Sequence, residues 1–261
     1  GFREINGLDD DAAAALMGPR GDSLHVLVDL MGYTHGARDG VVALQPAPLV
    51  MGFKGFMGSL GAAWLSHMVV DPVAVPPDLA RWHDEAGVYL APCFSPAAHA
   101  HNHPEISGSE RGEGRKERAE RRAERREIGL PEGAFVFCCF NSLYKVSPTI
   151  FAVWMRILRT VDTSVLWLQD EPAGSGQVLK EAARAAGVDP SRVIVTNKAG
   201  LHRHLLLKRH ADLFLDTPIY NGHSTAADLL WAGVPVLTLP REKMASRVAA
   251  SLVWRGAGLP E

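Results

Sequence analysis

Two short loops in the second half of the sequence combine residue types that bind anions. The loop FNSLYKVSP holds Lys145, and a lysine that follows a buried strand contacts phosphate oxygens as a compact point charge. The loop NGHST, residues 221–225, precedes an apolar helical segment. Backbone N–H groups at the start of a helix bind anions because the helix dipole places positive charge there. On position alone, an ordinary exposed lysine and a well-capped structural helix also explain these loops.

The residues of the second loop, and Asp228 in the helix that follows, are expected to have different roles. Ser224 or Thr225 is expected to cap the helix that runs through AADLLWAG, since hydroxyl side chains accept hydrogen bonds from the first helical N–H groups. Gly222 is expected to leave room for a ligand, and His223 adds a donor. Asp228 follows about one turn later, where a carboxylate reaches a ribose hydroxyl.

The elements around these loops predict an α/β fold. Five apolar runs without sustained alternation are typical of strands buried on both faces: AFVFCCF, SVLWLQD, RVIVTN, ADLFLDT and PVLTLP. Helical segments are predicted between them, around residues 148–160, 175–186, 201–209 and 225–232. This order predicts a parallel, doubly wound sheet, whose ligands bind at the carboxyl ends of the strands. Both loops lie at such ends, and two convergent phosphate donors favour a diphosphate ligand.

The first half carries a weaker α/β pattern. Strands are predicted at LHVLVDL, in the apolar run that ends at Met51, and at HMVVDP. The glycines at positions 52, 55, 58 and 61 predict a tight loop in which the backbone approaches something closely, although a plain hairpin explains them as well. The acidic residues 9–11 are interpreted as the cap of an N-terminal helix rather than a metal site.

Residues 95–132 change composition and are interpreted as a charged linker. Alternating Glu and Arg predict a solvated helix and an exposed connector. Three histidines alternate beside prolines, and a loop is favoured over a metal site because no partner pattern accompanies them; they are His99, His101 and His103. Three more are spread over the helical segment near residue 205 and are expected to be solvated or hydrogen-bonded rather than catalytic: His202, His204 and His210.

Composition excludes several classes of protein. The 261 residues are 47% hydrophobic with a formal net charge of -2, so no global basic field favours nucleic acid. Three cysteines, two of them adjacent at Cys138 and Cys139, form no disulfide framework and no zinc spacing, which favours a reducing compartment. No apolar run of about 18 residues predicts a membrane span. The expectation is a soluble intracellular protein, and the start at Gly1 suggests a piece of a longer one.

Several stretches closely resemble the catalytic region of the O-linked N-acetylglucosamine transferases, nucleocytoplasmic enzymes that transfer GlcNAc from UDP-GlcNAc to Ser and Thr hydroxyls of proteins. They are FNSLYKVSP, SVLWL, ADLFLDTPIYNGHSTAADLLWAGVPVLTLP and ASRVAAS, with LHVLVDLMGYTHGAR, LQPAPL and the glycine loop resembling the amino-terminal lobe. The resemblance implies the GT-B architecture, two Rossmann-like lobes with the nucleotide site in the carboxyl-terminal lobe. It divides the chain into a partial amino-terminal lobe (1–94), the linker (95–132) and a truncated carboxyl-terminal lobe (133–261).

The resemblance also implies residue roles. Lys145 is expected to be catalytic and to stabilise the UDP leaving group, with His25 as a second catalytic residue. His25 and Thr34 are expected to border the sugar and the acceptor. The remaining expected contacts divide into phosphate, ribose and uridine: His223, Ser224 and Thr225 for the phosphates, Asp228 for the ribose, Ala199 and His204 for the uridine, and Ser142 where the family usually has glutamine.

The implied reaction is an inverting single displacement that needs no metal and no cofactor, with UDP-GlcNAc as donor and proteins as acceptors. The implied location is cytoplasmic or nucleocytoplasmic, and no nucleic-acid or membrane partner is expected. The sequence departs from the family where Leu201 and Leu207 replace basic residues that help hold the uridine, and where Met57 replaces proline. It contains no tetratricopeptide repeats, which the family places before this region, and it stops soon after ASRVAAS.

Three other functions stay open. A Spindly-like relative would transfer fucose from GDP-fucose, a pseudoenzyme or scaffold would bind nucleotide without transfer, and a structural α/β module would bind no nucleotide. Within the helical segment 201–209, a competing interpretation buries Leu201 and Leu207 as core. It turns Arg203 or Lys208 toward the nucleotide instead.

Overall fold

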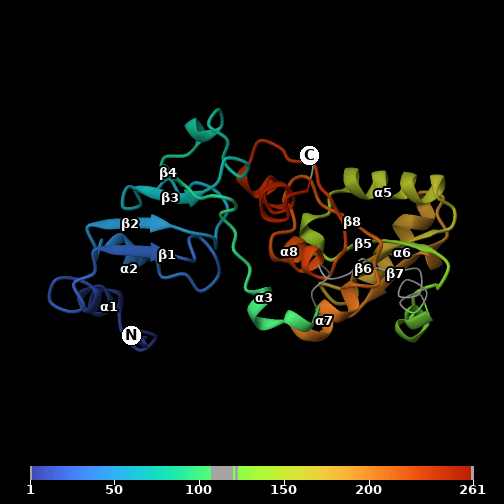
Figure 1. Ribbon diagram of the computed structural model, residues 1–261, viewed down its shortest axis with the longest axis horizontal. Helices are drawn as coiled ribbons and strands as arrows, with labels where there is room; N and C mark the ends of the chain where they lie inside the picture. Colours follow the sequence, from blue (N-terminus) through green and yellow to red (C-terminus); the bar gives the residue numbers. More distant parts are fainter. Residues whose placement is uncertain (1, 107–119, 121–122, 260–261) are drawn as a thin grey trace. The chain divides into compact units, whose positions relative to one another are not determined.

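The computed structural model describes residues 2–106, 120 and 123–259, and the chain forms two compact units (Figure 1). The first unit comprises Gly1–Ser95 and Glu242–Ala245, and the second comprises Pro96–Arg241 and Ser246–Glu261. Each unit is built on one parallel sheet. Most of the segment that was predicted as a solvated charged helix, residues 107–119 and 121–122, lies outside the described residues.

The first unit contains a four-stranded sheet in the order β1-β2-β3-β4. Its strands are β1 Val26–Asp29, β2 Leu49–Gly52, β3 His67–Val70 and β4 Ala86–Tyr89. The three predicted strands are confirmed, whereas β4 was missed because AGVY has no apolar alternation. Helix α1, Asp10–Met17, begins where Asp9 accepts a hydrogen bond from Ala12 N at 2.7 Å, so the predicted cap is confirmed. The small residues of α1 pack against α2, Asp39–Ala43.

The second unit contains a five-stranded parallel sheet in the order β7-β6-β5-β8-β9. All five predicted strands are present: β5 Phe135–Cys139, β6 Ser164–Gln169, β7 Val193–Thr196, β8 Leu213–Leu215 and β9 Val236–Leu237. Every residue of β6 is buried. A parallel sheet covered by helices on both faces has no face exposed to water, which explains the unbroken apolar runs in the sequence.

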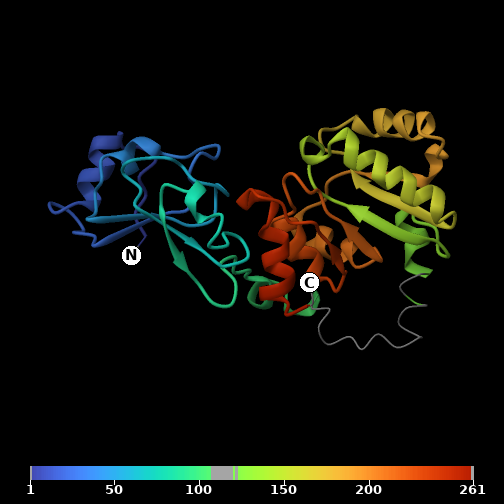
Figure 2. The same ribbon diagram turned by 90° about the horizontal axis from the view of Figure 1, so that it is seen from above.

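The predicted helices of this unit are also present: α5 Pro148–Thr160, α6 Ser175–Ala185, α7 Leu201–Lys208 and α8 Ser224–Trp231. Helix α5 begins with Ser147 as cap and proline at its first position, a combination that preorganises a helix start. Helices α5 and α6 lie side by side, while α7 and α8 contact each other and lie apart from that pair (Figures 1 and 2).

Shorter elements fill the remaining parts of the second unit: α3 His99–Asn102, η2 Pro104–Ile106, η3 Arg125–Ile128, η4 Leu143–Lys145, α9 Val248–Ser251 and the π-turn Leu252–Gly256. Arg125 corrects the prediction of an exposed charged connector. Its side chain is fully buried, donates to His210 O at 2.9 Å and to Ala134 O at 3.0 Å, and pairs with Asp212 at 2.7 Å. The end of the charged run is therefore part of the fold.

The strand order places a topological switch point between β5 and β8. From β5 the chain adds β6 and then β7 on one side, and it returns to add β8 and β9 on the other. The carboxyl ends of β5 and β8 are therefore neighbours, and the loops that follow them lead to opposite faces of the sheet. Doubly wound proteins bind their ligands in the crevice between two such loops. The two loops that the sequence predicts to bind anions leave these two strands.

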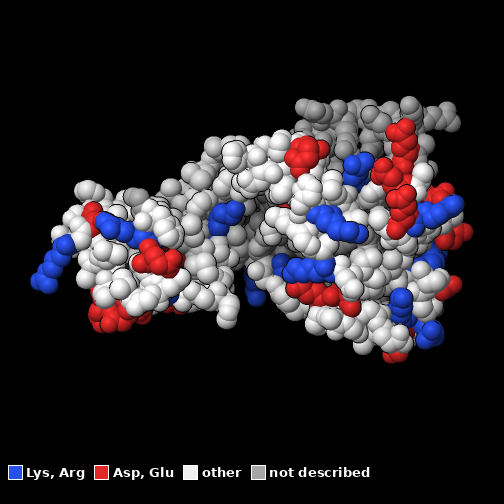
Figure 3. Space-filling view, turned by 90° about the horizontal axis from the view of Figure 1, so that it is seen from below, with Lys and Arg blue, Asp and Glu red and all other residues white. Residues whose placement is uncertain are grey.

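The surface of the second unit mixes both signs of charge. On the face drawn in Figure 3, Lys and Arg side chains are interspersed with Asp and Glu, in keeping with the net charge of -2. None of the helices within the described residues has both the length and the apolar content that a membrane span requires.

Candidate functional site

A buried carboxylate connects the loops at the switch point. Asp216 directly follows β8 and is only 6% exposed. It accepts hydrogen bonds from Gly222 N at 2.7 Å, from Thr238 Oγ1 at 2.7 Å and from Asn141 Nδ2 at 3.1 Å. These donors come from the loops after β8, β9 and β5. Asp216 thus joins three strand ends into one rigid support.

Burial and hydrogen bonding act in opposite directions on this carboxyl. Burial raises the pKa of Asp216 to about 6, and the hydrogen bonds from Gly222, Thr238 and Asn141 lower it by less than burial raises it. The carboxylate form is therefore the main form at neutral pH, at a cost in stability. Its charge in turn raises the pKa of the nearby Lys145 ammonium, while burial of that lysine has the larger, lowering effect.

Lys145 is held by the loop that leads into α8. Its Nζ donates to Asn221 O at 2.9 Å and lies 3.9 Å from the centre of the Tyr220 ring, a distance at which a cation and an aromatic face attract. The side chain is partly buried, so the alternative of an ordinary exposed lysine is wrong. An ammonium has three donors. Asn221 O accepts from one of them, and among the described residues the other two leave donor capacity for an anion.

The loop between β8 and α8 is fixed by its own side chains. Asn141 Nδ2 donates to Thr217 Oγ1 at 2.7 Å, and Thr217 Oγ1 donates to Tyr220 O at 2.6 Å. Asn221 Nδ2 donates to Thr217 O at 2.9 Å. The carbonyl that holds Lys145 therefore belongs to a preorganised turn.

The start of α8 differs from the prediction. The residue before its first turn is His223, with φ -96° and ψ -91°, and within the described part of the chain no side chain caps this helix. The prediction that Ser224 or Thr225 is the cap is wrong, because these two residues form the first turn itself. Helix starts have N–H groups without intrahelical acceptors, so an uncapped start two residues after Asn221 suits an anion.

Gly222 does not leave room for a ligand, contrary to the prediction. A Cβ at this position would lie 2.9 Å from Asn141 Oδ1 and 3.3 Å from Ala226 N. The space is filled by the protein itself. Glycine is required here so that the loop passes close to Asn141, whose Oδ1 is buried.

Asp228 is engaged by two side chains. It is 8% exposed, and its Oδ2 pairs with Lys208 Nζ at 2.7 Å. Its Oδ1 lies 2.7 Å from His99 Nε2. Lys208 is only 1% exposed, and burial lowers its pKa, with the Asp228 charge opposing that effect. Carboxylate oxygens have about four lone-pair sites together, so this arrangement leaves acceptor capacity for a ligand hydroxyl.

His204 lies on the same helix as Lys208 and is uncharged at neutral pH. Burial, followed by the nearby Lys208 charge, lowers the pKa of His204 to about 4. Its ring packs edge-on against Phe140 at 5.5 Å. A neutral imidazole has one donor and one acceptor nitrogen, which suits an uncharged base better than a phosphate.

A cavity of about 420 Å³ lies at the carboxyl end of β7. Ala199 and Leu207, both predicted near the uridine, line it together with Trp167 and Arg203. Ser142, the remaining predicted contact in this unit, precedes the turn Leu143–Lys145 and is partly buried.

The orientation of α7 decides between the two interpretations of its leucines. Leu201 is 59% exposed and Leu207 is partly buried, whereas Leu205 is the fully buried leucine of this helix. The competing interpretation that both leucines form core is therefore wrong. Lys208 is turned inward as that interpretation proposed, but it pairs with Asp228.

In the first unit, the two predicted residues lie at opposite ends of β1. Thr34 follows the carboxyl end, in a turn where its Oγ1 donates to Met31 O at 2.9 Å. His25 precedes Val26, the first residue of the strand. The sheet edge at which ligands bind in such units therefore includes Thr34 but not His25.

The glycine loop of the first unit approaches its own chain. Gly55 has φ +46°, and a Cβ there would lie 2.4 Å from Leu30 O. The close approach expected from the glycine spacing is thus to the backbone that follows β1, and Tyr33 completes the contact by donating to Leu60 O at 2.9 Å.

Several residues of the site were missed in the sequence. Asp216 and Asn221 lie within the same motif as His223, at the strand end and in the loop, so their position was a usable signal. Lys208 and His99 were not predictable as partners of Asp228, because they are 20 and 129 residues away from it.

Two Rossmann-like units, each built on a parallel sheet, are the architecture of the GT-B class of glycosyltransferases. The chain superimposes on a K341M mutant of Thermobaculum terrenum O-GlcNAc transferase with a TM-score of 0.81 and 26% identity, over 98% of this chain and 45% of that one. It also matches Anabaena Alr3699/HepE in complex with UDP and glucose with a TM-score of 0.55 over 98% of this chain and 80% of that one, at 11% identity, which shows the fold alone. The predicted GT-B architecture is confirmed.

Within this class, the chain belongs to glycosyl transferase family 41, whose model matches residues 4–120 and 109–261. It is 38% identical to the probable UDP-N-acetylglucosamine--peptide N-acetylglucosaminyltransferase SEC of Arabidopsis thaliana, over 96% of this chain and 24% of that protein. Identity is 27% to the Caenorhabditis elegans UDP-N-acetylglucosamine--peptide N-acetylglucosaminyltransferase, over 92% and 29% of the two chains. The chain is 28% identical to the probable UDP-N-acetylglucosamine--peptide N-acetylglucosaminyltransferase SPINDLY of Oryza sativa subsp. japonica, over 97% of this chain and 26% of that protein. The family resemblance is confirmed, and the chain spans about a quarter of these relatives.

Proposed function

We propose that this chain is catalytic-region sequence of a transferase that moves GlcNAc from UDP-GlcNAc to Ser and Thr hydroxyls of proteins. The observation that carries the proposal is the contact of Lys145 Nζ with Asn221 O at 2.9 Å. It joins the ammonium group to the uncapped start of α8 at the switch point. The names of the relatives support the donor and the acceptor class.

The proposed reaction is an inverting single displacement. An acceptor hydroxyl attacks the anomeric carbon, its proton passes to the leaving diphosphate, and UDP departs from the opposite face. Charge that develops on the diphosphate is stabilised by Lys145 and by the start of α8, where His223, Ser224 and Thr225 surround the phosphates. Preorganised donors of this kind contribute about 3 to 4 kcal/mol each, so the proposal requires neither metal nor cofactor for the transfer step.

The nucleoside is assigned to the neighbouring helix α7. Neutral His204 and the cavity lined by Ala199 and Leu207 are proposed to contact the uracil, with Ser142 nearby. Asp228 is proposed to accept a hydrogen bond from the ribose while it stays paired with Lys208. In the first unit, Thr34 is proposed to border the sugar and the acceptor, and His25 is left out because it lies at the other end of β1. The proposed location is cytoplasmic or nucleocytoplasmic.

Thermal unfolding with UDP and with GDP, followed by a transfer assay with UDP-GlcNAc and a Ser-containing acceptor peptide, tests this function. The expected result is stabilisation by UDP and not by GDP, with sugar transferred to the peptide. Stabilisation by GDP alone would favour the fucose donor. Binding of UDP with neither transfer nor sugar hydrolysis would favour a nucleotide-binding scaffold, and no response to either nucleotide would refute the proposal.

A further inference from the structure

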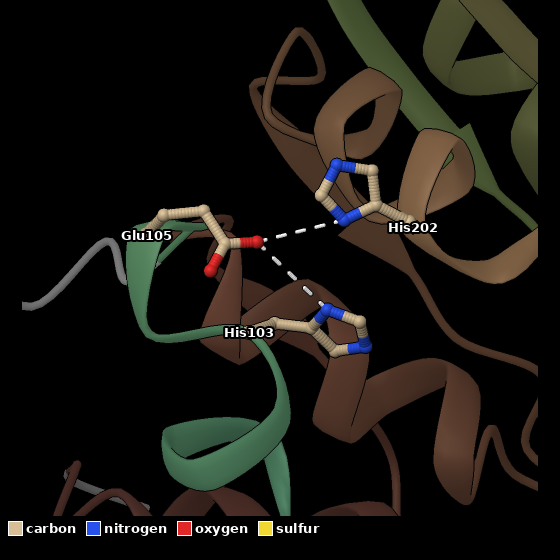
Figure 4. Close-up of side chains that lie close together, drawn as sticks. All are labelled: His103, Glu105 and His202. Atoms are coloured by element: carbon tan, nitrogen blue, oxygen red, sulfur yellow. Dashed lines mark ion pairs between the residues drawn. The ribbon is translucent and has the colours of Figure 1, made fainter.

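Three side chains outside the switch point converge on one spot in the second unit (Figure 4). His103 and Glu105 come from the segment around η2, and His202 comes from the first turn of α7. Glu105 Oε1 lies 3.9 Å from His103 Nδ1 and 3.5 Å from His202 Nδ1. All three ligand atoms lie within 4.8 Å of one another.

The donor set suits a transition-metal cation. Two imidazole nitrogens and one carboxylate oxygen are a recurrent ligand set for Zn²⁺, with a water molecule in the fourth position. Zinc bonds of about 2.0 to 2.2 Å place tetrahedral ligand atoms roughly 3.4 Å apart. The two carboxylate-to-imidazole separations, 3.9 and 3.5 Å, are close to this value, and the two imidazole nitrogens, which lie within 4.8 Å of each other, move together when a metal binds. We propose that His103, Glu105 and His202 form a Zn²⁺-binding site.

Contacts that are independent of the metal anchor the backbone of the segment that carries His103 and Glu105. Trp231 Nε1 donates to His103 O at 2.9 Å, and the residue after Glu105, Ile106, is 2% exposed. The short segment that carries two ligands is therefore anchored on both sides of Glu105. A site with preorganised ligands loses little conformational entropy on binding, which distinguishes this cluster from histidines on a free loop.

The site is open to solvent. The side chains of Glu105 and His202 are 53% and 59% exposed, which gives an ion an entry path and room for a bound water. Bound Zn²⁺ connects the segment around η2 to α7, the helix that carries His204. The sequence analysis favoured a loop over a metal site for the alternating histidines, because it looked for a ligand pattern among His99, His101 and His103. The cluster instead combines His103 with Glu105, two residues later, and with His202 on α7. His99 lies against Asp228 and is not part of the cluster.

Calorimetric titration of ZnCl₂ into the chelator-treated 261-residue chain without a histidine tag tests the site. The expected result is one Zn²⁺ per chain. Loss of a residue that merely orients a metal ligand costs about 10- to 100-fold in affinity, so His103→Ala, Glu105→Gln and His202→Ala should each weaken binding by about 100-fold or more. His101→Ala is the matched control, because His101 is exposed on the same segment outside the cluster.

Thermal unfolding with and without Zn²⁺ is the second measurement. Zinc should raise the Tm of the parent chain and of His101→Ala, since a ligand that binds only the folded state stabilises it, and this rise should be absent in His202→Ala. Circular dichroism checks that each variant is folded. No stoichiometric binding to the parent chain, or an equal Tm rise in the His103→Ala/His202→Ala double variant, would overturn the proposal.

Discussion

The loops at the switch point and the helix α7 represent two different ways to build a binding site. At the switch point, Asp216, Asn141 and Asn221 hydrogen-bond to groups in neighbouring loops and to backbone. In α7, the inward face carries the buried ion pair between Lys208 and Asp228, and Leu201 lies exposed on the same helix. The first region is held by a network of hydrogen bonds among loops, and the second by one charged pair between two helices.

The difference shows which kind of structure a short motif determines. The turn after β8 is fixed partly by bonds within a few residues, such as Thr217 Oγ1 to Tyr220 O and Asn221 Nδ2 to Thr217 O, and a short motif can determine these bonds. The orientation of a short helix depends on partners far away in the sequence, so a change such as an inward-facing Lys208 rearranges which side chains face a ligand.

The largest effect is expected from breaking the ion pair in α7. Removing one partner of a buried pair leaves an uncompensated charge and costs about 3 to 5 kcal/mol. Lys208→Met should therefore lower the free energy of unfolding by about 3 kcal/mol or more, as measured by urea titration. We expect the lower end of the range of about 3 to 5 kcal/mol because His99 still bonds to Asp228 in this variant.

The matched control is Lys198→Met, whose salt bridge with Glu171 is exposed, with 65% and 39% of the two side chains accessible. An exposed pair contributes about 1 kcal/mol or less. The double variant Lys208→Met/Asp228→Leu should recover most of the lost stability. If Lys208→Met costs no more than the control, the ion pair does not set the orientation of α7.

The next effect is a pH dependence from Asp216 at the switch point. Because burial raises its pKa from 3.8 to about 6, the folded state binds this proton more tightly than the unfolded state. The resulting stability is fully present below about pH 4 and is lost as the pH rises through 6. A shift of this size corresponds to about 3 kcal/mol.

Asp216→Asn isolates this contribution, because it stays neutral and has both an acceptor and a donor for the neighbouring groups. The free energy of unfolding of the variant minus that of the parent chain should increase by about 3 kcal/mol between pH 4 and pH 7. A difference that stays constant over this range would show that the Asp216 carboxyl is not perturbed by its burial.

A smaller effect is expected from restoring basic side chains in α7. Charged hydrogen bonds contribute about 1.5 to 3 kcal/mol, so Leu207→Arg and Leu201→Lys should each tighten UDP binding roughly 10- to 100-fold by calorimetry. Val178→Lys adds a charge at an exposed apolar position of α6 and should change nothing. Loss of stability without a gain in affinity would contradict the proposed position of the nucleoside.

The smallest effect is expected from Thr225→Val at the start of α8. Because Thr225 is inside the helix and not its cap, urea titration should show a change within about 0.5 kcal/mol. UDP affinity should fall by the contribution of one hydrogen bond, about 0.5 to 1.5 kcal/mol. A stability loss of 1 kcal/mol or more would restore the interpretation as a cap.

The sequence predicted the second unit better than the first, and the loops better than the contacts between distant residues. Long apolar runs with α5 to α8 between them specify a parallel sheet, so β5 to β9 and their site-bearing edge were predictable. The weaker runs of the first unit left β4 undetected. The predicted strand LHVLVDL already placed His25 at its start and Thr34 beyond its end, so the role given to His25 came from the resemblance and not from the strand pattern.

The features that the sequence analysis predicted wrongly or did not predict depend on contacts between segments that come together only in the folded chain. The cap of α8, the neighbour of Gly222 and the partners of Asp228 all depend on how the loops after β5 and β8 pack. Buried Arg125 shows the same limit, since one arginine in a run of charges pairs with Asp212 and nothing in the run marks it.

The most direct test of the central claim is the calorimetric titration of UDP into the parent chain and into Lys145→Met. Methionine keeps an apolar stem against Tyr220 and removes the ammonium group that contacts Asn221 O. The account predicts one UDP per parent chain, and binding at least about 10-fold weaker in Lys145→Met with an unchanged urea midpoint. Lys180→Met on α6 should bind UDP like the parent chain. Equal UDP affinity in the parent chain and Lys145→Met, or no binding to the parent chain, would contradict a diphosphate site at the switch point.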